Sequence, residues 1–133
     1  MQNGAGQDFR IRFDAETGIV RVSLRGDMPD EAFVQYRDAM AGALEQAHAV
    51  APAARVLIDG RDMENMPANA ADRIAELGLM FTCEDRVAMI VRSSLLKIEA
   101  RRVAHSDAVQ TFLSENAART WLMAYSVPNA TAA

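Results

Sequence analysis

Two strands near the N-terminus are predicted by a regular alternation of apolar and charged residues. Residues 9–13 are apolar at every second position, and the same period returns over residues 19–25. A period of two places the apolar side chains on one face of a strand and the charged ones on the other. Gly18 is suited to close the intervening turn. We therefore expect a β-hairpin with one solvated face, near the edge of a sheet.

A central strand-to-helix unit is predicted over residues 55–81. The apolar run 55–58 is typical of a strand buried on both faces, which implies a parallel neighbour on each side. A charged turn is expected over 59–69, and the apolar residues that follow recur at helical spacing. Asn69 is the expected N-cap of this helix, and Asp72 lies in its first turn.

The carboxyl end of this central strand is where we expect a binding site. In open α/β sheets, ligands and partners prefer the crevice beyond the carboxyl ends of the strands. The turn and the helix it opens provide several polar side chains at that place. The candidate binding surface consists of Asp59, Arg61, Asp62, Asn69 and Asp72.

Elsewhere in the chain, the pattern predicts two more strands and three more helices. The apolar run over 86–91 is typical of a buried strand, and residues 109–112 are expected to form a last short strand. Helix-start signals over residues 26–31, with Pro29 near the first turn, predict the first helix, which is expected to end near His48. The remaining two helices are expected to start at capping serines, Ser93 or Ser94 for one and Ser114 for the other.

The predicted element order is ββαβαβαβα, a hairpin followed by repeated strand–helix units. This order predicts an α/β fold with a mixed sheet, parallel in its centre, packed with about four helices. A chain of 133 residues suits one domain. We expect this domain over 9–126, with a flexible N-terminus at 1–8 and a flexible tail at 127–133.

Composition and charge restrict the class of protein. Half of the residues are hydrophobic and 24% are charged, as in a soluble globular protein. The net charge of −4 and the pI near 5.1 disfavour nucleic acid as a partner. No apolar run is long enough for a membrane span or a secretory signal, so we expect a cytoplasmic protein without integral membrane contact.

The charge is unevenly distributed along the chain. Residues 59–85 hold seven acids and two arginines, a net charge of −5, whereas residues 86–105 hold five basic residues and one acid, a net charge of +4. Two solvated faces of opposite sign would explain this distribution. Two surfaces that meet a partner, or each other in a homodimer, would explain it as well.

Side chains suited to catalysis or to metal binding are sparse. A nucleophile would need a nearby histidine, and the chain has only His48 and His105. Cys83 falls between a helix end and a buried strand, where we expect a small core thiol. Acidic residues in the turn after the central strand more often cap backbone groups than bind a metal. We therefore expect no catalytic residue, no metal and no cofactor.

Methionines around the central unit give a second hypothesis. Met80, Met89 and the nearby Leu96 could line a pocket for a small apolar ligand. Ordinary filling of gaps in the core would explain the same residues.

Three stretches carry a resemblance to a known family: VLIDGRDMENM from Val56, RVAMIV from Arg86 and FLSENAARTWL from Phe112. Together with the element order, they resemble the SpoIIAA-like branch of the STAS superfamily, which has the fold of bacterial anti-sigma-factor antagonists and is often named alongside CRAL-TRIO domains. The likeness covers about residues 9–125, and Trp121 and Leu122 match the family's usual Trp-Leu pair. Phospho-regulated antagonists carry a serine at the start of the helix after the central strand. This chain has no serine or threonine from Gly60 to Phe81, so that phosphoacceptor is missing.

The resemblance implies a non-enzymatic, bacterial protein-interaction module that associates as a homodimer and binds a partner protein of unknown identity. A carrier or sensor of a small apolar or lipid-like ligand is the first alternative. A small enzyme of unknown reaction is the second.

Overall fold

The computed structural model describes residues 9–26, 28–63, 69–94, 98 and 108–124, so the segments predicted to be flexible at both ends lie outside it. Of the third predicted helix it describes only Ser94 and Ile98, both helical. The other described elements are β1 (Phe9–Asp14), β2 (Ile19–Gly26), α1 (Asp30–Val50), β3 (Arg55–Met63), α2 (Ala70–Gly78), β4 (Arg86–Ile90), β5 (Val109–Phe112) and α4 (Glu115–Ala124).

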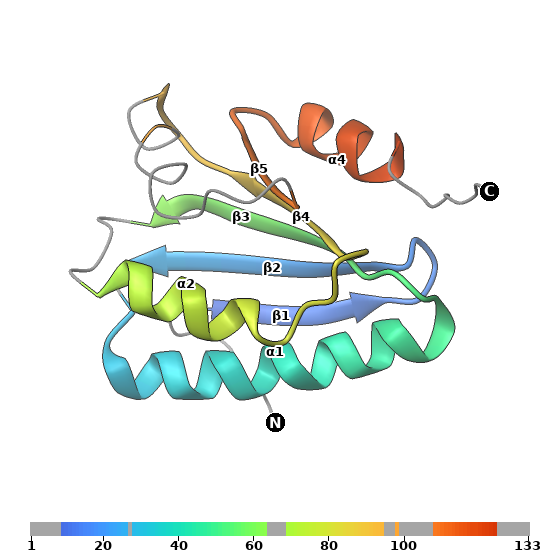
Figure 1. Cartoon of the computed structure of the whole chain (residues 1–133). Coiled ribbons are helices and arrows are strands. Elements are labelled where there is room, and N and C mark those ends of the chain that lie inside the picture. The colour runs from blue at the N-terminus through green and yellow to red at the C-terminus, as the bar shows by residue number, and fades with distance from the viewer. Residues whose placement is uncertain (1–8, 27, 64–68, 95–97, 99–107, 125–133) are drawn as a thin grey trace.

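The five strands form one mixed sheet in the order β1-β2-β3-β4-β5 (Figure 1). β1 and β2 pair in antiparallel, and each later strand pairs in parallel with the strand before it. Gly18 closes the hairpin with a φ of 76°, and its backbone N–H donates to the Asp14 carbonyl at 2.7 Å. The predicted α/β class, the hairpin at the sheet edge and the parallel centre are confirmed.

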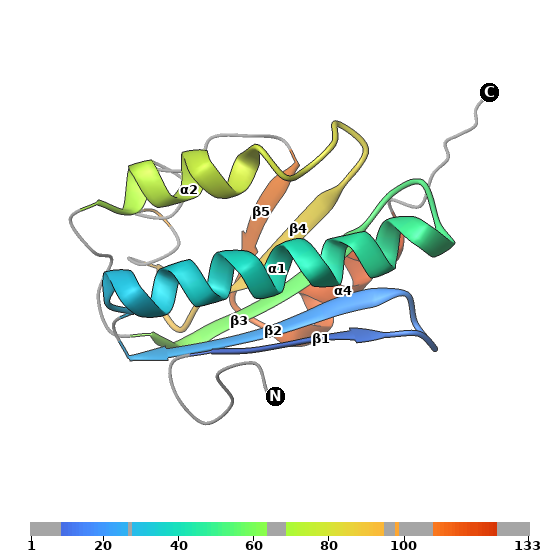
Figure 2. The same ribbon diagram turned by 90° about the horizontal axis from the view of Figure 1, so that it is seen from below.

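Helices cover the two faces of the sheet unequally (Figures 1 and 2). α1 and α2 lie on one face, where Phe33, Tyr36 and Met40 of α1 pack with the inward side chains of β1 to β3. α4 lies on the other face and buries Ala118 and Leu122 completely in a smaller core. The first helix begins after Pro29 as predicted and extends two residues beyond His48.

β3 is longer than the sequence predicts. The expected turn from Asp59 is strand as far as Met63, because β2 continues to pair with it, Ser23 opposite Asp59 and Arg25 opposite Asp62, with one irregularity between them. Gly60 permits close packing at this point. A Cβ there would lie 3.0 Å from the Met89 methyl carbon and 3.2 Å from the Ile90 carbonyl oxygen.

α2 begins at Ala70, and Asn69 occupies the N-cap position as predicted. The Asn69 side chain, however, makes no capping hydrogen bond. It donates instead to the carboxylate of Asp30 at 3.3 Å. α2 ends at Gly78 and is followed by short hydrogen-bonded turns. Phe81, at the end of these turns, packs against the core between α1 and the sheet.

Candidate functional site

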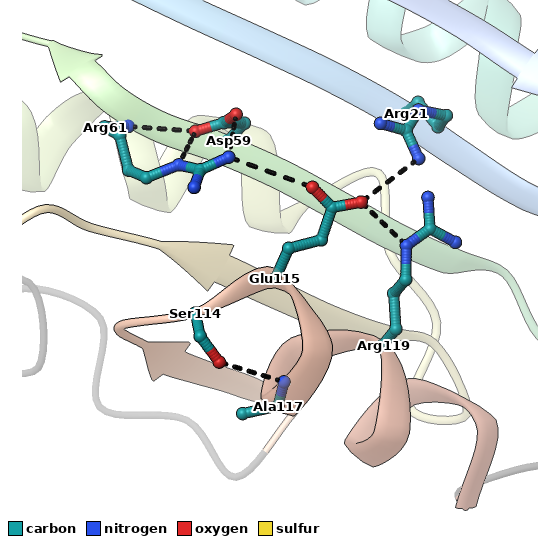
Figure 3. A network of polar contacts seen from close by, with 7 residues as sticks. All are labelled: Arg21, Asp59, Arg61, Ser114, Glu115, Ala117 and Arg119. Carbon is teal, nitrogen blue, oxygen red and sulfur yellow. Dashed lines mark hydrogen bonds and ion pairs between the residues drawn. The ribbon is translucent and has the colours of Figure 1, made fainter.

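Asp59 and Arg61 form a paired unit at the carboxyl end of β3, on the face that carries α4 (Figure 3). The Arg61 guanidinium donates to both oxygens of Asp59, from Nε to Oδ1 at 2.9 Å and from Nη2 to Oδ2 at 2.8 Å. The Arg61 backbone N–H also donates to Oδ1, at 3.1 Å. Both side chains stay more than a third exposed, Asp59 at 36% and Arg61 at 42%. The pair is therefore held in one geometry and still accessible to solvent.

Glu115, the first residue of α4, connects this pair to two other elements. Its Oε1 lies 3.8 Å from Nη2 of Arg61, and its Oε2 lies 3.8 Å from Nη1 of Arg21 on β2 and 2.8 Å from Nε of Arg119 (Figure 3). The helix start is fixed by Ser114, whose hydroxyl accepts from the Ala117 backbone N–H at 3.2 Å, as the sequence predicts. We call Arg21, Asp59, Arg61, Glu115 and Arg119 the α4-side network.

Charge pairing perturbs two groups of the α4-side network. The hydrogen bond from the Arg61 side chain lowers the pKa of Asp59, burial opposes this shift, and the Arg61 backbone N–H and the charge of Arg21 lower it further. In return, the hydrogen bond to Asp59 raises the pKa of Arg61. Both side chains are thus charged at neutral pH.

The other predicted surface residues lie apart from this network. Asn69 contacts Asp30 at the start of α1, and Arg73 Nη2 binds the same Asp30 carboxylate at 2.8 Å. These contacts lower the pKa of Asp30, chiefly through the hydrogen bond from Arg73. Asp62 and Asp72 are exposed. Within the described residues, no hydrogen bond or ion pair joins Asn69 or Asp72 to the α4-side network.

A buried carboxylate, which sequence reasoning did not single out, joins three segments of the chain at the opposite end of the strands. Asp85 is only 1% exposed and accepts from the backbone N–H groups of Ala54 at 2.7 Å and of Thr82 at 2.8 Å. Nε2 of His48, near the end of α1, lies 3.0 Å from the same carboxylate. The sequence analysis treated His48 only as a helix-end residue. The sequence offered one signal for this buried side chain, which is that an acidic residue directly precedes a strand predicted to be buried.

The residues considered for chemistry are dispersed. Cys83, expected in the core, is exposed in the loop after α2, because the chain turns there toward β4 and only the Asp85 side chain points inward. His105 lies outside the described residues. In the described part of the chain, no three His, Cys, Asp or Glu side chains are grouped so that they could hold a metal ion.

Comparisons with known proteins identify the fold. No model of a protein family matches the chain, and no curated protein matches it. Solved structures do match it, among them the following two. One is an uncharacterized protein of the DUF3478 family with a SpoIIAA-like fold from Shewanella loihica PV-4, with 25% identity and a TM-score of 0.62 over 86% of this chain and 94% of that one. The other is the anti-sigma factor antagonist SpoIIAA in its unphosphorylated form, with 10% identity and a TM-score of 0.61 over 90% of this chain and 99% of that one.

The chain has a SpoIIAA-like fold, in common with both of these structures. Both matches span nearly the whole of the other chain and at least 86% of this one, so the likeness extends over most of the fold. The resemblance inferred from the sequence is confirmed. None of the helices in the described ranges has the length and apolar character required to span a membrane.

The predicted apolar lining of this SpoIIAA-like domain is described only in part. Met80 packs against the core below α1, and Met89 on β4 lies over Gly60 on the same side of the sheet. Leu96 lies outside the described residues. The apolar-ligand hypothesis stays a prediction.

Proposed function

We propose that this SpoIIAA-like domain is a non-enzymatic protein-interaction module that binds its partner through the carboxyl end of β3. The observation that supports this most directly is the α4-side network. It holds Asp59 and Arg61 in a fixed, partly exposed arrangement at the place where α/β sheets most often bind their partners.

Fixed charges on a protein surface favour specific association. An arginine that is already held by hydrogen bonds loses little side-chain entropy when a partner docks. Its charge also orients an approaching partner and disfavours partners with the wrong charge pattern. Since the stretch from Gly60 to Phe81 has no serine or threonine, binding here would not be switched by phosphorylation of that stretch.

The proposal is tested by alanine variants at the end of β3. We expect Arg61→Ala and Asp62→Ala to lose proteins that the wild type captures by chemical crosslinking and affinity purification, with the melting temperature nearly unchanged. Glu45→Ala is the matched control, because Glu45 is an exposed charge on α1, on the opposite face of the sheet. If both β3 variants capture the same proteins as the wild type and the control, this surface is not the binding site.

Two further parts of the proposal can be tested separately. Asn69→Ala and Asp72→Ala probe whether the binding surface extends to the start of α2, and an unchanged set of captured proteins would limit it to β3. Native mass spectrometry reports whether the domain is a homodimer and whether a small molecule copurifies with it. Extra mass that is lost on denaturation would favour the apolar-ligand alternative.

A further inference from the structure

A second charged surface lies on the hairpin. The alternation in β1 and β2 turns the apolar residues toward α1, except Ile19, which is buried in the core under α4. It leaves six further outward positions, 10, 12, 14, 21, 23 and 25. Four of these positions hold arginine and only one holds an acid, Asp14. We call Arg10, Arg12, Arg21 and Arg25 the arginine face.

No described helix covers the arginine face. α4 packs over β3, β4 and β5 and reaches β2 near its start, through Ile19 and the ion pair between Glu115 and Arg21. α1 and α2 lie on the other side of the sheet (Figures 1 and 2). Arg10 and Arg12 are exposed, and neither forms an ion pair with another described residue.

The arginines that face each other on β1 and β2 destabilise the hairpin. Arg12 and Arg21 are directly opposite one another in the register of β1 and β2. Like charges at such a cross-strand position repel each other, and a threonine or a glutamate in place of Arg12 would pair better. Glu115 already offsets part of the Arg21 charge, and a further anion that bound between the two guanidinium groups would relieve the remaining repulsion.

The domain itself shows which anion fits beside these strands. The Glu115 carboxylate lies between Arg21, Arg61 and Arg119, next to the arginine face (Figure 3). A guanidinium binds a carboxylate through two parallel hydrogen bonds, as Arg61 does with Asp59. A carboxylate is therefore already bound at the border of this surface.

A carboxylate-rich protein segment fits the arginine face better than a nucleic acid or a membrane. The six outward positions include no aromatic residue on which bases could stack and no apolar residue that could enter a bilayer. The face is two strands wide, roughly 10 Å with its side chains, which suits a short segment. A longer polyanion would extend over the rest of a chain whose net charge is −4.

We propose that the arginine face binds a short acidic segment of a partner protein, whose carboxylates pair with Arg10, Arg12 and Arg21. This inference rests on the proposed function and names the chemistry of the partner. The segment would lie beside the α4-side network, so that the two surfaces form one continuous binding face across β1, β2 and β3.

The test is direct binding of a fluorescent hexaglutamate peptide to the purified protein, followed by fluorescence anisotropy at two salt concentrations. We expect Arg10→Gln combined with Arg12→Gln to weaken binding on the order of tenfold, and added salt to weaken wild-type binding. The matched control combines Gln35→Glu with Gln46→Glu. It changes the net charge by the same amount at two exposed positions of α1, and it should alter binding by less than about twofold.

A structural role for these arginines predicts a different result. If they stabilised the hairpin, the double variant would lower the melting temperature; under the proposal the melting temperature stays the same or rises, because the repulsion between Arg12 and Arg21 is removed. Equal weakening by the variant and the control would overturn the inference. So would tighter binding of an oligothymidylate of equal charge, or of phosphatidylserine vesicles, than of the peptide.

A negative result in the peptide assay and a negative result in the partner capture have different consequences. The peptide assay uses no natural partner, so a negative result there removes the arginine face and leaves the β3 surface as it stands. Loss of captured proteins only in Arg61→Ala and Asp62→Ala, with the Arg10 and Arg12 double variant unchanged, would likewise retain the proposed function and remove the inference.

Discussion

Asp85 and Asp59 are two carboxylates at opposite ends of the same sheet, and they have opposite surroundings. Asp85 is 1% exposed and has hydrogen-bonding partners from three separate segments. Asp59 is about a third exposed and is held by an arginine two residues away. The amino end of the parallel strands is thus closed by a buried, hydrogen-bonded acidic side chain, and the carboxyl end keeps its polar side chains accessible. Under the proposed function, the amino end serves stability and the carboxyl end serves binding.

Replacing the buried carboxylate should produce the largest effect. Asp85→Ala leaves the N–H groups of Ala54 and Thr82 without their partner, and we expect it to lower the free energy of unfolding by about 3 kcal/mol. Asp85→Asn keeps one acceptor and should lose less. Urea denaturation followed by circular dichroism measures both. Asp59→Ala is the control, and a loss as large as that of Asp85→Ala would remove the distinction between the two ends.

The histidine partner should contribute less than the carboxylate. His48→Ala removes one side-chain partner of Asp85 and leaves both backbone donors, so we expect a loss of about 1 kcal/mol. The two substitutions should not be additive, because His48 has no carboxylate to contact once Asp85 is gone. A double-mutant cycle with Asp85→Ala measures this, and full additivity would mean that the His48 contact does not act through Asp85.

The exposed pair should matter little for stability. Arg61→Ala removes a surface ion pair, for which we expect a loss below about 1 kcal/mol. The same denaturation experiment detects it. A loss comparable to that of Asp85→Ala would assign the α4-side network a structural role and weaken its interpretation as a binding surface.

Acid should produce the smallest effect through Asp59. The pKa of Asp59 is lower in the folded protein than in the unfolded chain, so its contribution to stability is present above the unfolded value of about 3.9 and is lost as the pH falls through the folded value. Because the group is partly exposed, we expect a few tenths of a kcal/mol. Asp59→Asn should flatten the stability profile below about pH 4 relative to the wild type. Identical stability profiles for the wild type and the variant would contradict the lowered pKa of Asp59.

The sequence was sufficient for features that depend on local periodicity. The alternation in the hairpin, Gly18 at its turn, the start of α1 after Pro29 and the Ser114 cap all depend on neighbouring residues, and each is found in the structure. The length of β3 was not predictable in this way. Its charged second half reads as a turn until β2 is known to pair alongside it.

The polar clusters form through contacts between segments that are far apart in the chain. Asp85 meets Ala54 across 31 residues, and no local pattern marks such a pair. Glu115 reaches Arg61 only because α4 packs beside the end of β3, and Asn69 turned to Asp30 because α1 begins nearby. The positions of the candidate site residues in the chain were thus enough to name them. Which of them lie close together could be known only from the fold.

The order of the strands across the sheet is the same as their order along the chain. During synthesis, each strand that leaves the ribosome therefore finds its pairing partner already made, and the hairpin provides the first edge onto which β3 can add. Of the five described strands, none has to insert between two that have already paired. The domain can consequently assemble from its N-terminus onward, and α4 completes the second face last.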